Sequence, residues 1–171
     1  MATALIDDRS VVNKDPTVSL RQETDPLGAL QRVREQAVAN GLKYSGCVLP
    51  ELAWQLFQAG QALLVDVRTP EELSYVGRVP GATHVAWATG TAQVRNPRFL
   101  RELESKVPKN TVVLFLCRSG KRSAAAAEAA TKAGYGSAFN VLEGFEGEID
   151  ERRRRGALGG WRLHGLPWIQ D

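Results

Sequence analysis

The hydrophobic positions of the chain fall into short apolar runs separated by amphipathic segments. Apolar runs of about four to eight residues that are bounded by turn residues indicate buried strands. We predict five such strands, at residues 44–49, 62–67, 83–87, 111–117 and 137–142. The run at 111–117, TVVLFLC, is the strongest of them because it is apolar along almost its whole length.

The segments between these runs carry the end signals of helices. Asp25, Thr69 and Asn96 each stand directly before a proline, and this arrangement is typical of a helix N-cap followed by the first helical residue. We predict five helices, at residues 26–40, 50–60, 69–77, 96–107 and 123–134. Because strands and helices alternate, the sequence predicts an α/β domain with a mainly parallel sheet.

The two ends of the chain depart from this alternation. Residues 1–25 are polar and without clear periodicity, so we expect an N-terminal arm. With the first helix it forms a predicted region 1–44, followed by a domain at 45–171. Near the other end, four acidic residues precede the run Arg152–Arg155. These charges cancel, which favours a solvated loop; the alternative is a rim that steers anions or docks an acidic partner.

Composition limits the classes of protein to which the chain can belong. Its 171 residues, 43% of them hydrophobic, suffice for one domain with a core. The net charge of +3 is too small to argue for nucleic-acid binding. The N-terminus lacks the pattern of a secretory signal, and no apolar run approaches the ~18 residues of a membrane span. We therefore expect a cytoplasmic protein with neither a membrane nor a nucleic-acid partner.

Cysteine and histidine are scarce in the sequence. Cys47 and Cys117 are too few for a disulfide framework in a chain of this length, and we expect reduced thiols. His84 and His164 lie far from both cysteines in the sequence, so no metal-ligand spacing is present. We expect structural roles for both histidines.

Cys117 stands where the strongest strand meets a basic loop and a helix. Ligands of open parallel sheets bind beyond the carboxyl ends of the strands, and the N–H groups of a strand–loop–helix turn form an anion site. Arg118, Lys121 and Arg122 add three positive charges, which favour the thiolate, the nucleophilic form of cysteine. The sequence therefore predicts a nucleophile that acts on a small anion. The alternative is a buried structural cysteine beneath a solvated basic loop.

The length of the loop separates two anion chemistries. Cysteine phosphatases use the pattern C-x-x-x-x-x-R, whose cradle holds a phosphoryl group, whereas Arg122 follows Cys117 after one residue fewer. The smaller cradle favours a single sulfur atom carried on the cysteine, and it disfavours a phosphatase or an arsenate reductase. A Cys–His hydrolase has weak support because no histidine follows at a useful local spacing.

Five segments in order carry a family resemblance. They are LLVDVRTPEEL at 63–73, GRVPGATHV at 77–85, CRSGKRS at 117–123, NVLEGFEGEI at 140–149 and WRLHGLPW at 161–168. Between residues 45 and 168 the chain resembles the rhodanese family of sulfurtransferases, and it departs at Arg78, where many relatives have histidine. The resemblance implies a five-stranded, mainly parallel sheet flanked by helices on both faces, here with an N-terminal helical arm.

The resemblance also implies a two-step sulfur transfer. The Cys117 thiolate attacks the outer sulfur of thiosulfate or a related anionic donor and keeps that sulfur as a persulfide. A thiol or cyanide acceptor, or an acceptor protein, then removes it. The loop amides stabilise the sulfur, and the three basic side chains attract the donor. The implied loop comprises Arg118, Ser119, Gly120, Lys121, Arg122 and Ser123. No metal or organic cofactor is implied.

Other residues are candidates for supporting the site. We expect Asp66 and Arg68 to form a structural ion pair near Cys117, and Trp87 either to line the mouth of the pocket or to pack in the core. For Cys47 we expect a half-buried strand position, against a role in resolving the persulfide as a disulfide. The alternative function is a carrier that moves sulfur between proteins and has little thiosulfate activity.

Overall fold

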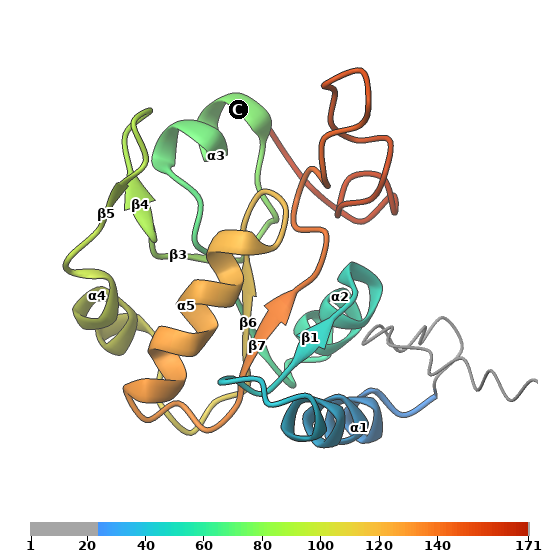
Figure 1. Ribbon diagram of the computed structural model, residues 1–171, viewed down its shortest axis with the longest axis vertical. Coiled ribbons are helices and arrows are strands. Elements are labelled where there is room, and N and C mark those ends of the chain that lie inside the picture. The colour runs from blue at the N-terminus through green and yellow to red at the C-terminus, as the bar shows by residue number, and fades with distance from the viewer. Residues whose placement is uncertain (1–23, 171) are drawn as a thin grey trace, which may run out of the picture.

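Five parallel strands form the main sheet of the protein (Figure 1), whose computed structural model describes residues 24–170. The strands are β1 (Cys47–Val48), β2 (Leu63–Asp66), β3 (Thr83–His84), β6 (Val113–Leu116) and β7 (Ala138–Val141), in the order β1-β7-β6-β2-β3. All neighbours in this sheet pair in parallel. The predicted α/β class and its parallel sheet are confirmed, and the first 23 residues of the predicted arm lie outside the described residues.

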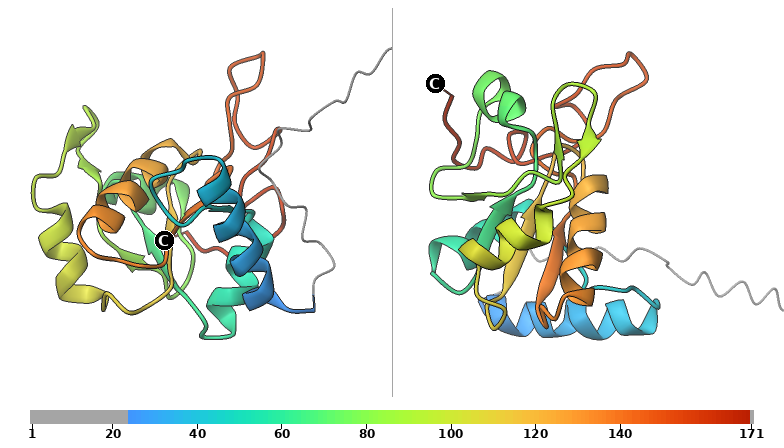
Figure 2. Two further views of the ribbon diagram at one scale, coloured as in Figure 1. Left: turned by 60° about the horizontal axis from the view of Figure 1, so that its bottom comes forward. Right: turned by 90° about the vertical axis from the view of Figure 1, so that its left-hand side faces the viewer.

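Helices cover both faces of the sheet. Helices α1 (Pro26–Ala39) and α2 (Pro50–Gln58) pack on one face, and α4 (Phe99–Lys106) and α5 (Lys121–Lys132) pack on the other (Figure 2). Helix α3 (Pro70–Val76) lies beyond the carboxyl ends of the strands (Figure 1). Within residues 24–170, no helix is long and apolar enough to cross a membrane.

Neighbouring residues of β6 belong to different cores because successive side chains of a strand point to opposite faces. Leu114 and Leu116 pack with α1 and α2, whereas Phe115 and Cys117 pack with α4 and α5. All residues of β6 are buried, which explains why this stretch is apolar throughout instead of alternating. The register of the strand therefore points the Cys117 side chain toward α5.

Helix α1 begins as the sequence predicts. The Asp25 side chain accepts a hydrogen bond from the backbone N–H of Gly28 at 3.0 Å, which caps the first turn. The helix buries Leu30 and Val33 in the same cluster that α2 joins. It therefore packs into one core with elements beyond residue 45, although the prediction grouped it with the N-terminal arm.

Three details of the chain differ from the predicted elements. Helix α4 begins at Phe99 with Arg98 as its N-cap, so Asn96 does not cap it as predicted, and the Asn96 side chain instead accepts from the backbone N–H of Arg98 at 2.9 Å. Helix α5 begins at Lys121, two residues before the predicted start at Ser123. Gly120 turns the chain into this helix in a left-handed conformation with φ of 96°, which residues with a side chain adopt at a cost. An antiparallel ribbon of β4 (Ala88–Thr89) and β5 (Val94–Arg95) escapes prediction, because strands of two residues carry no readable period.

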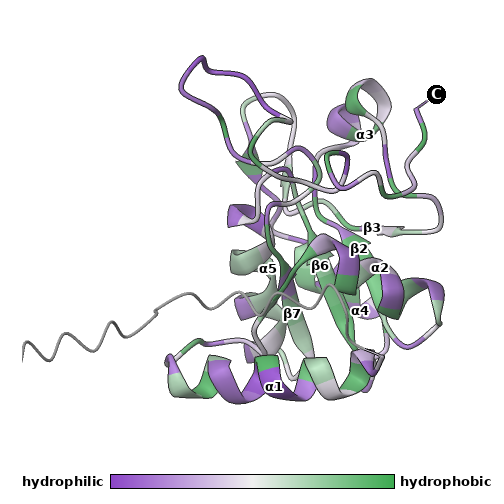
Figure 3. Ribbon diagram, turned by 90° about the vertical axis from the view of Figure 1, so that its right-hand side faces the viewer, coloured by the Kyte–Doolittle hydropathy of each residue, from purple (hydrophilic) through white to green (hydrophobic). Residues whose placement is uncertain are grey.

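The last segment of the chain, residues 143–170, is irregular but anchored. It forms no helix within the described residues, and its one β-bridge joins Ile169 to Arg78. Trp161 is fully buried and donates a hydrogen bond from its ring N–H to the carbonyl of Pro167 at 2.9 Å. Figure 3 shows that a hydrophilic loop of this segment projects from the molecule, while β6 and β7 in the interior are hydrophobic.

A buried ion pair fixes the end of β2 against its surroundings. Asp66 and Arg68 approach to 2.6 Å between Oδ2 and Nη2, with side chains 2% and 0% exposed. Arg68 also donates to the carbonyl of Gly77 at 2.9 Å, and its guanidinium lies 4.0 Å from the ring centre of Phe145. The pair that the sequence predicts therefore ties β2 to the end of α3 and to the irregular segment.

We expect Arg68→Met to lower the free energy of unfolding by about 3–5 kcal/mol, because it leaves the Asp66 carboxylate buried without its partner. Urea unfolding followed by circular dichroism measures the change. The double variant Asp66→Val/Arg68→Met is the control, and it should lose less than the single variant because no buried charge remains. Equal losses in the two variants would contradict this account of the pair.

Candidate active site

The sulfur of Cys117 lies at the carboxyl end of β6, beneath the first turn of α5. The residue is 1% exposed. Two groups contact the sulfur at 3.1 Å: the backbone N–H of Gly120 and the hydroxyl of Ser123. The N-terminus of α5 also directs its positive end toward this position. Of the predicted loop residues 118–123, Gly120 and Ser123 thus contact the sulfur directly.

The irregular segment supports the loop from behind. The backbone N–H groups of Phe145 and Glu146 donate to the carbonyls of Cys117 and Arg118 at 2.8 and 2.9 Å. This approach requires Gly144, since a Cβ at that position would lie 2.5 Å from the carbonyl oxygen of Cys117. The motif EGFEG at 143–147 therefore holds the active-site loop through its backbone.

Arg122 is engaged by a carboxylate that the sequence analysis does not single out. Its two terminal nitrogens each donate to a carboxylate oxygen of Glu72 at 2.7 Å, and the side chains are 17% and 13% exposed. Arg122 also donates to the Gln93 side chain at 2.8 Å. This ion pair joins the first turn of α5 to α3 and to the turn between β4 and β5.

A local signal in the sequence could have identified Glu72. Its carboxylate accepts a hydrogen bond from the backbone N–H of Thr69 at 3.0 Å, and the Thr69 hydroxyl accepts one from the backbone of Glu72 at 3.3 Å. This reciprocal pair is a capping box, which follows from the spacing T-x-x-E. The box sets the side-chain position of Glu72, but its spacing carries no information about Arg122, which is 50 residues away.

The ion pair stabilises the charged forms of both partners. Burial raises the pKa of Glu72, but the hydrogen bonds from Arg122 and Thr69 outweigh burial and lower that pKa from 4.5 to about 2. Burial also lowers the pKa of Arg122, and the contact with Glu72 outweighs it, so that this pKa is raised. The guanidinium charge that was expected to attract an anionic donor is therefore already matched by a carboxylate.

The other two cations of the loop differ from Arg122. Lys121 lies 3.6 Å from Glu148, but both side chains are largely exposed, and such a pair is weak. The Nε atom of Arg118 is buried and donates no hydrogen bond to any described residue. Of the three basic side chains, Arg118 therefore keeps a donor that no protein acceptor uses.

Ser123 joins the sulfur to a second buried residue. Its hydroxyl lies 3.1 Å from the sulfur of Cys117 and 2.6 Å from the side-chain oxygen of Asn140, and both polar residues are buried. A hydroxyl has one proton, so it donates either to the sulfur or to Asn140. Sequence reasoning missed Asn140, because this residue lies on a different strand, β7. It comes near Cys117 only because of the way in which β7 pairs with β6.

The second cysteine is held apart from the first by the sheet. Cys47 is half-buried on β1 and pairs with Asn140, which in turn pairs with Phe115. The strand β7 thus separates Cys47 from β6, and two strand spacings amount to roughly 9.6 Å. Because disulfides need Cα atoms within about 7 Å, this geometry does not allow Cys47 to pair directly with Cys117.

Trp87 packs against the cluster of buried residues that includes Phe99 and Cys117. Its half-buried ring meets Phe99 edge-on at 4.9 Å between centres, and the guanidinium of Arg95 lies 3.3 Å from its ring centre. Of the two roles considered for Trp87, these contacts favour packing.

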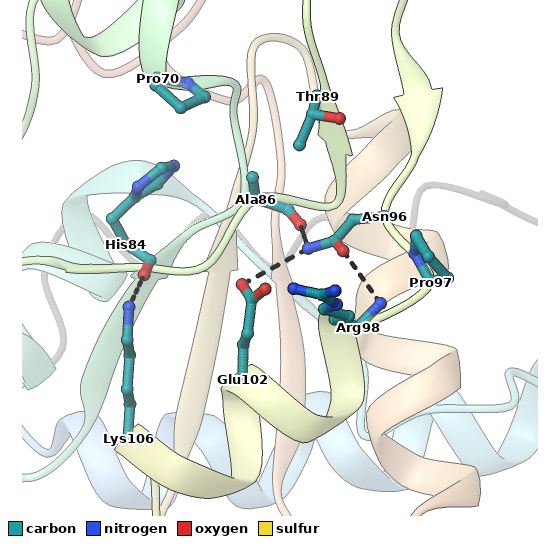
Figure 4. Close-up of a pocket in the computed structure, with 9 residues that line it drawn as sticks. All are labelled: Pro70, His84, Ala86, Thr89, Asn96, Pro97, Arg98, Glu102 and Lys106. Atoms are coloured by element: carbon teal, nitrogen blue, oxygen red, sulfur yellow. Dashed lines mark hydrogen bonds between the residues drawn. The ribbon is translucent and has the colours of Figure 1, made fainter.

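A groove of about 480 Å³ lies beside the site, between α3, α4 and the β4–β5 ribbon (Figure 4). Its side chains include Asn96, which donates to the carbonyl of Ala86 at 2.9 Å, and Lys106, which donates to the carbonyl of His84 at 2.8 Å. No residue of the loop 117–123 lines this groove. The groove is therefore separate from the cradle around the sulfur.

Both histidines bind structural partners. The ring of His84 contacts the carbonyl of Arg68 at 2.8 Å. The two ring nitrogens of His164 lie 2.7 Å from Glu51 and 2.6 Å from Glu143, and this bridge ties the irregular segment to α2. Within the part of the chain that the structure describes, no group of three or more histidine, cysteine or acidic side chains could hold a metal ion.

Comparisons with known proteins find relatives over most of the chain. A family model described as a rhodanese-like domain matches residues 49–148. The crystal structure of Rv0390 from M. tuberculosis is 44% identical, with a TM-score of 0.69, over 75% of this chain and 99% of that one. A sulfurtransferase of Allochromatium vinosum is 32% identical over 69% of this chain and 88% of its own. An uncharacterised protein of Rickettsia rickettsii is 34% identical over 66% and 87%, respectively.

The ion pair of Glu72 makes stability depend on pH. A carboxyl group whose pKa falls from 4.5 to about 2 on folding stabilises the folded state at pH 7 by up to about 3 kcal/mol. We expect Glu72→Gln to lose this amount at neutral pH, and the difference from the parent protein should shrink as the pH falls below about 4.5 toward 2. Urea unfolding of both proteins over this range of pH measures the difference.

The matched control is Glu71→Gln, which removes an exposed carboxylate one residue away on α3. We expect this surface change to stay within about 0.5 kcal/mol at neutral pH. A Glu72→Gln penalty that is equally large at low and at neutral pH would mean that packing, and not the ion pair, is responsible.

Proposed function

Because the chain belongs to the rhodanese-like domain family, we propose that it is a sulfurtransferase that carries a sulfane sulfur on Cys117. The observation that supports this most directly is the surrounding of the sulfur: one thiol at a strand end, with the amide of Gly120 and the hydroxyl of Ser123 each at 3.1 Å. The relative from Allochromatium vinosum that is named a sulfurtransferase supports the same activity.

The first step loads the cysteine. The Cys117 thiolate attacks the outer sulfur of thiosulfate or a related donor, a new S–S bond forms, and the bond within the donor breaks. The electron pair of the broken bond leaves with the remainder of the donor, which is sulfite in the case of thiosulfate. Gly120 and Ser123 donate toward the Cys117 sulfur and stabilise its negative charge before the attack, and in the persulfide that charge lies on the outer sulfur.

The second step unloads it. A thiolate or cyanide attacks the outer sulfur of the persulfide, and the electron pair of the S–S bond returns to Cys117 as a thiolate. The acceptor leaves as a persulfide or as thiocyanate. Both steps balance without an external oxidant or reductant, and no cofactor enters them. Ser123 serves both states, since its hydroxyl turns to the sulfur when that atom is charged and to Asn140 otherwise.

The size of the cradle supports a sulfur cargo over a phosphoryl group. Only six residues span Cys117 to Arg122, and the two contacts at 3.1 Å converge on a single atom. A phosphoryl group presents three outer oxygens that need donors of their own. The guanidinium that would serve them is bound bidentately to Glu72.

The same ion pair favours the second candidate, a carrier that exchanges sulfur with other thiols. An anionic donor such as thiosulfate has to compete with Glu72 for Arg122, whereas a persulfide brings no sulfonate that needs this cation. The unused Nε donor of Arg118 and the exposed ammonium group of Lys121 are the cationic groups of the loop that remain for a small anion. We therefore propose that thiol-borne persulfides, including those on proteins, are better donors than thiosulfate.

We expect the protein to gain the mass of one sulfur atom when it is incubated with a sulfane donor, and cyanide should remove that mass. Cys117→Ser should gain nothing, because a hydroxyl does not form a persulfide. Intact-protein mass spectrometry measures the change. Cys47→Ser is the matched control and should load like the parent protein, since Cys47 lies two strands away. Sulfur retained by Cys117→Ser would exclude Cys117 as the carrier.

Glu72→Gln tests whether the ion pair limits the use of thiosulfate. Removing the carboxylate charge frees the charge of Arg122 for the donor, and a solvent-exposed ionic contact is worth up to about 1 kcal/mol. We expect the KM for thiosulfate to fall roughly fivefold, while the KM for an uncharged organic persulfide stays the same. A thiosulfate assay with cyanide as acceptor measures the first value. A fall in both KM values would point instead to a general opening of the site.

A further inference from the structure

Residues 148–158 form a loop that projects beside the candidate active site (Figures 1 and 2), and we name it the arginine loop. Its neck closes where the backbone N–H of Gly156 donates to the carbonyl of Glu146 at 2.9 Å. Glu146 in turn donates its own backbone N–H to the carbonyl of Arg118 at 2.9 Å. The arginine loop therefore rises from the same backbone contacts that hold the loop of Cys117.

The tip of the arginine loop has a defined turn. Asp150 exchanges backbone hydrogen bonds with Arg154 and Arg153, and its carboxylate accepts from the backbone N–H of Arg154 at 2.7 Å. The Arg154 side chain closes this turn with an ion pair to Asp150 at 3.3 Å. Arg155 ties the base by donating to the carbonyl of Gly147 at 2.7 Å. These contacts order the turn before any partner binds.

Two guanidinium groups at this tip face solvent. Arg152 and Arg153 are exposed, and within residues 24–170 neither has an ion-pair partner. The neighbouring acidic side chains are partly neutralised, since Asp150 binds Arg154 and Glu148 lies 3.6 Å from Lys121. Glu151 beside them is also exposed, so the tip presents two guanidinium groups and one carboxylate to solvent and carries a small positive excess.

Apolar side chains accompany these cations. Ile149 is 48% exposed, Leu158 is 62% exposed, and Leu163 on the following turn is 51% exposed. A hollow of about 340 Å³ in the arginine loop is lined by two apolar and four charged residues: Ala157, Leu158, Asp150, Glu151, Arg152 and Arg154. A surface that combines exposed leucine and isoleucine with arginine suits a protein partner, because a small inorganic anion gains nothing from the apolar part.

We propose that the arginine loop docks an acidic protein segment that presents its cysteine thiol to the persulfide on Cys117. The proposal rests on the proposed sulfurtransferase function and adds the class of acceptor. Charge complementarity with Arg152 and Arg153 selects the partner and speeds its encounter. A nucleic acid is a poorer fit, since its phosphates gain nothing from the exposed side chains of Ile149 and Leu158.

The transfer at this surface balances in atoms and electrons. The thiolate of the docked cysteine attacks the outer sulfur of the Cys117 persulfide and forms a new S–S bond with it. The S–S bond to Cys117 breaks, and its electron pair remains on Cys117 as a thiolate. The partner leaves as a persulfide, and no further reactant is consumed.

The test uses the full chain loaded with sulfur from polysulfide and two synthetic acceptor peptides of equal length. Each peptide contains one cysteine and one leucine, with glutamates around them in one peptide and lysines in the other. The rate constant for loss of the sulfur mass is measured by quenched flow and mass spectrometry. We expect Arg152→Glu/Arg153→Glu to slow transfer to the acidic peptide about tenfold at 0.1 M salt and to leave transfer to cyanide unchanged.

The control is Arg98→Glu/Arg101→Glu, which makes the same change of charge at exposed positions at the start of α4. It should leave the acidic peptide's rate within about twofold of the parent, since surface charges beyond about 10 Å are largely screened at 0.1 M salt. Because each variant is compared with the parent on the same peptide, the intrinsic reactivity of the peptide thiol cancels.

Three results overturn the docking proposal. Transfer to the acidic peptide could proceed at the same rate in the parent and in the arginine-loop variant, or the α4 variant could lose as much of this rate as the arginine-loop variant does. The third result is that the parent binds a single-stranded oligonucleotide and the arginine-loop variant does not, while transfer to the peptide is unchanged. Failure to load sulfur, or failure to release it to cyanide, is a different result. It contradicts the proposed sulfurtransferase function itself, and the docking proposal falls with it.

Discussion

The ion pair between Glu72 and Arg122 sets the conditions under which this site works. It joins α3 to the first turn of α5, and Gln93 connects it to the β4–β5 ribbon. A bidentate pair between partly buried groups is stronger than an exposed one. It therefore holds the loop around Cys117 in shape, but it also uses the charge that makes such a loop attractive to anions. Structural order and anion binding compete for the same guanidinium.

This competition bears on the choice between the two proposed functions. A sulfur atom in transit needs few donors, and the amide of Gly120 with the hydroxyl of Ser123 supplies them. A sulfonate needs cations as well, and Arg118 alone among the three basic side chains has a buried donor that no described residue accepts from. The site is thus better matched to the sulfur that is transferred than to the anion that delivers it, which favours exchange between thiols.

The parts of the site that are local in sequence could be predicted, and the distant ones could not. The placement of Cys117 and its loop at a strand end follows from apolar runs and charges, whereas the pair of Asp66 with Arg68, which the structure contains, is expected from the family resemblance. Glu72 lies 50 residues from Arg122 and Asn140 lies 17 residues from Ser123, and no spacing rule connects either pair. The sequence shows that the loop has three cations, but only the folded structure shows which of them is bound by a carboxylate. The early start of α5 likewise depends on the left-handed Gly120, a backbone property.

Under the proposed sulfur transfer, the burial of Cys117 leaves the selection of partners to the rim of the site. A sulfur that is 1% exposed distinguishes poorly between the thiols that reach it, since only the attacking atom enters. Discrimination between partner proteins then has to come from the protein surface next to the Cys117 loop, which can contact the rest of the partner. The arginine loop meets this requirement because its base is hydrogen-bonded to Arg118 through Glu146, and its tip is ordered by Asp150. An ordered surface loses less entropy when a partner binds, so a short charged loop can affect the choice of acceptor without contacting the sulfur.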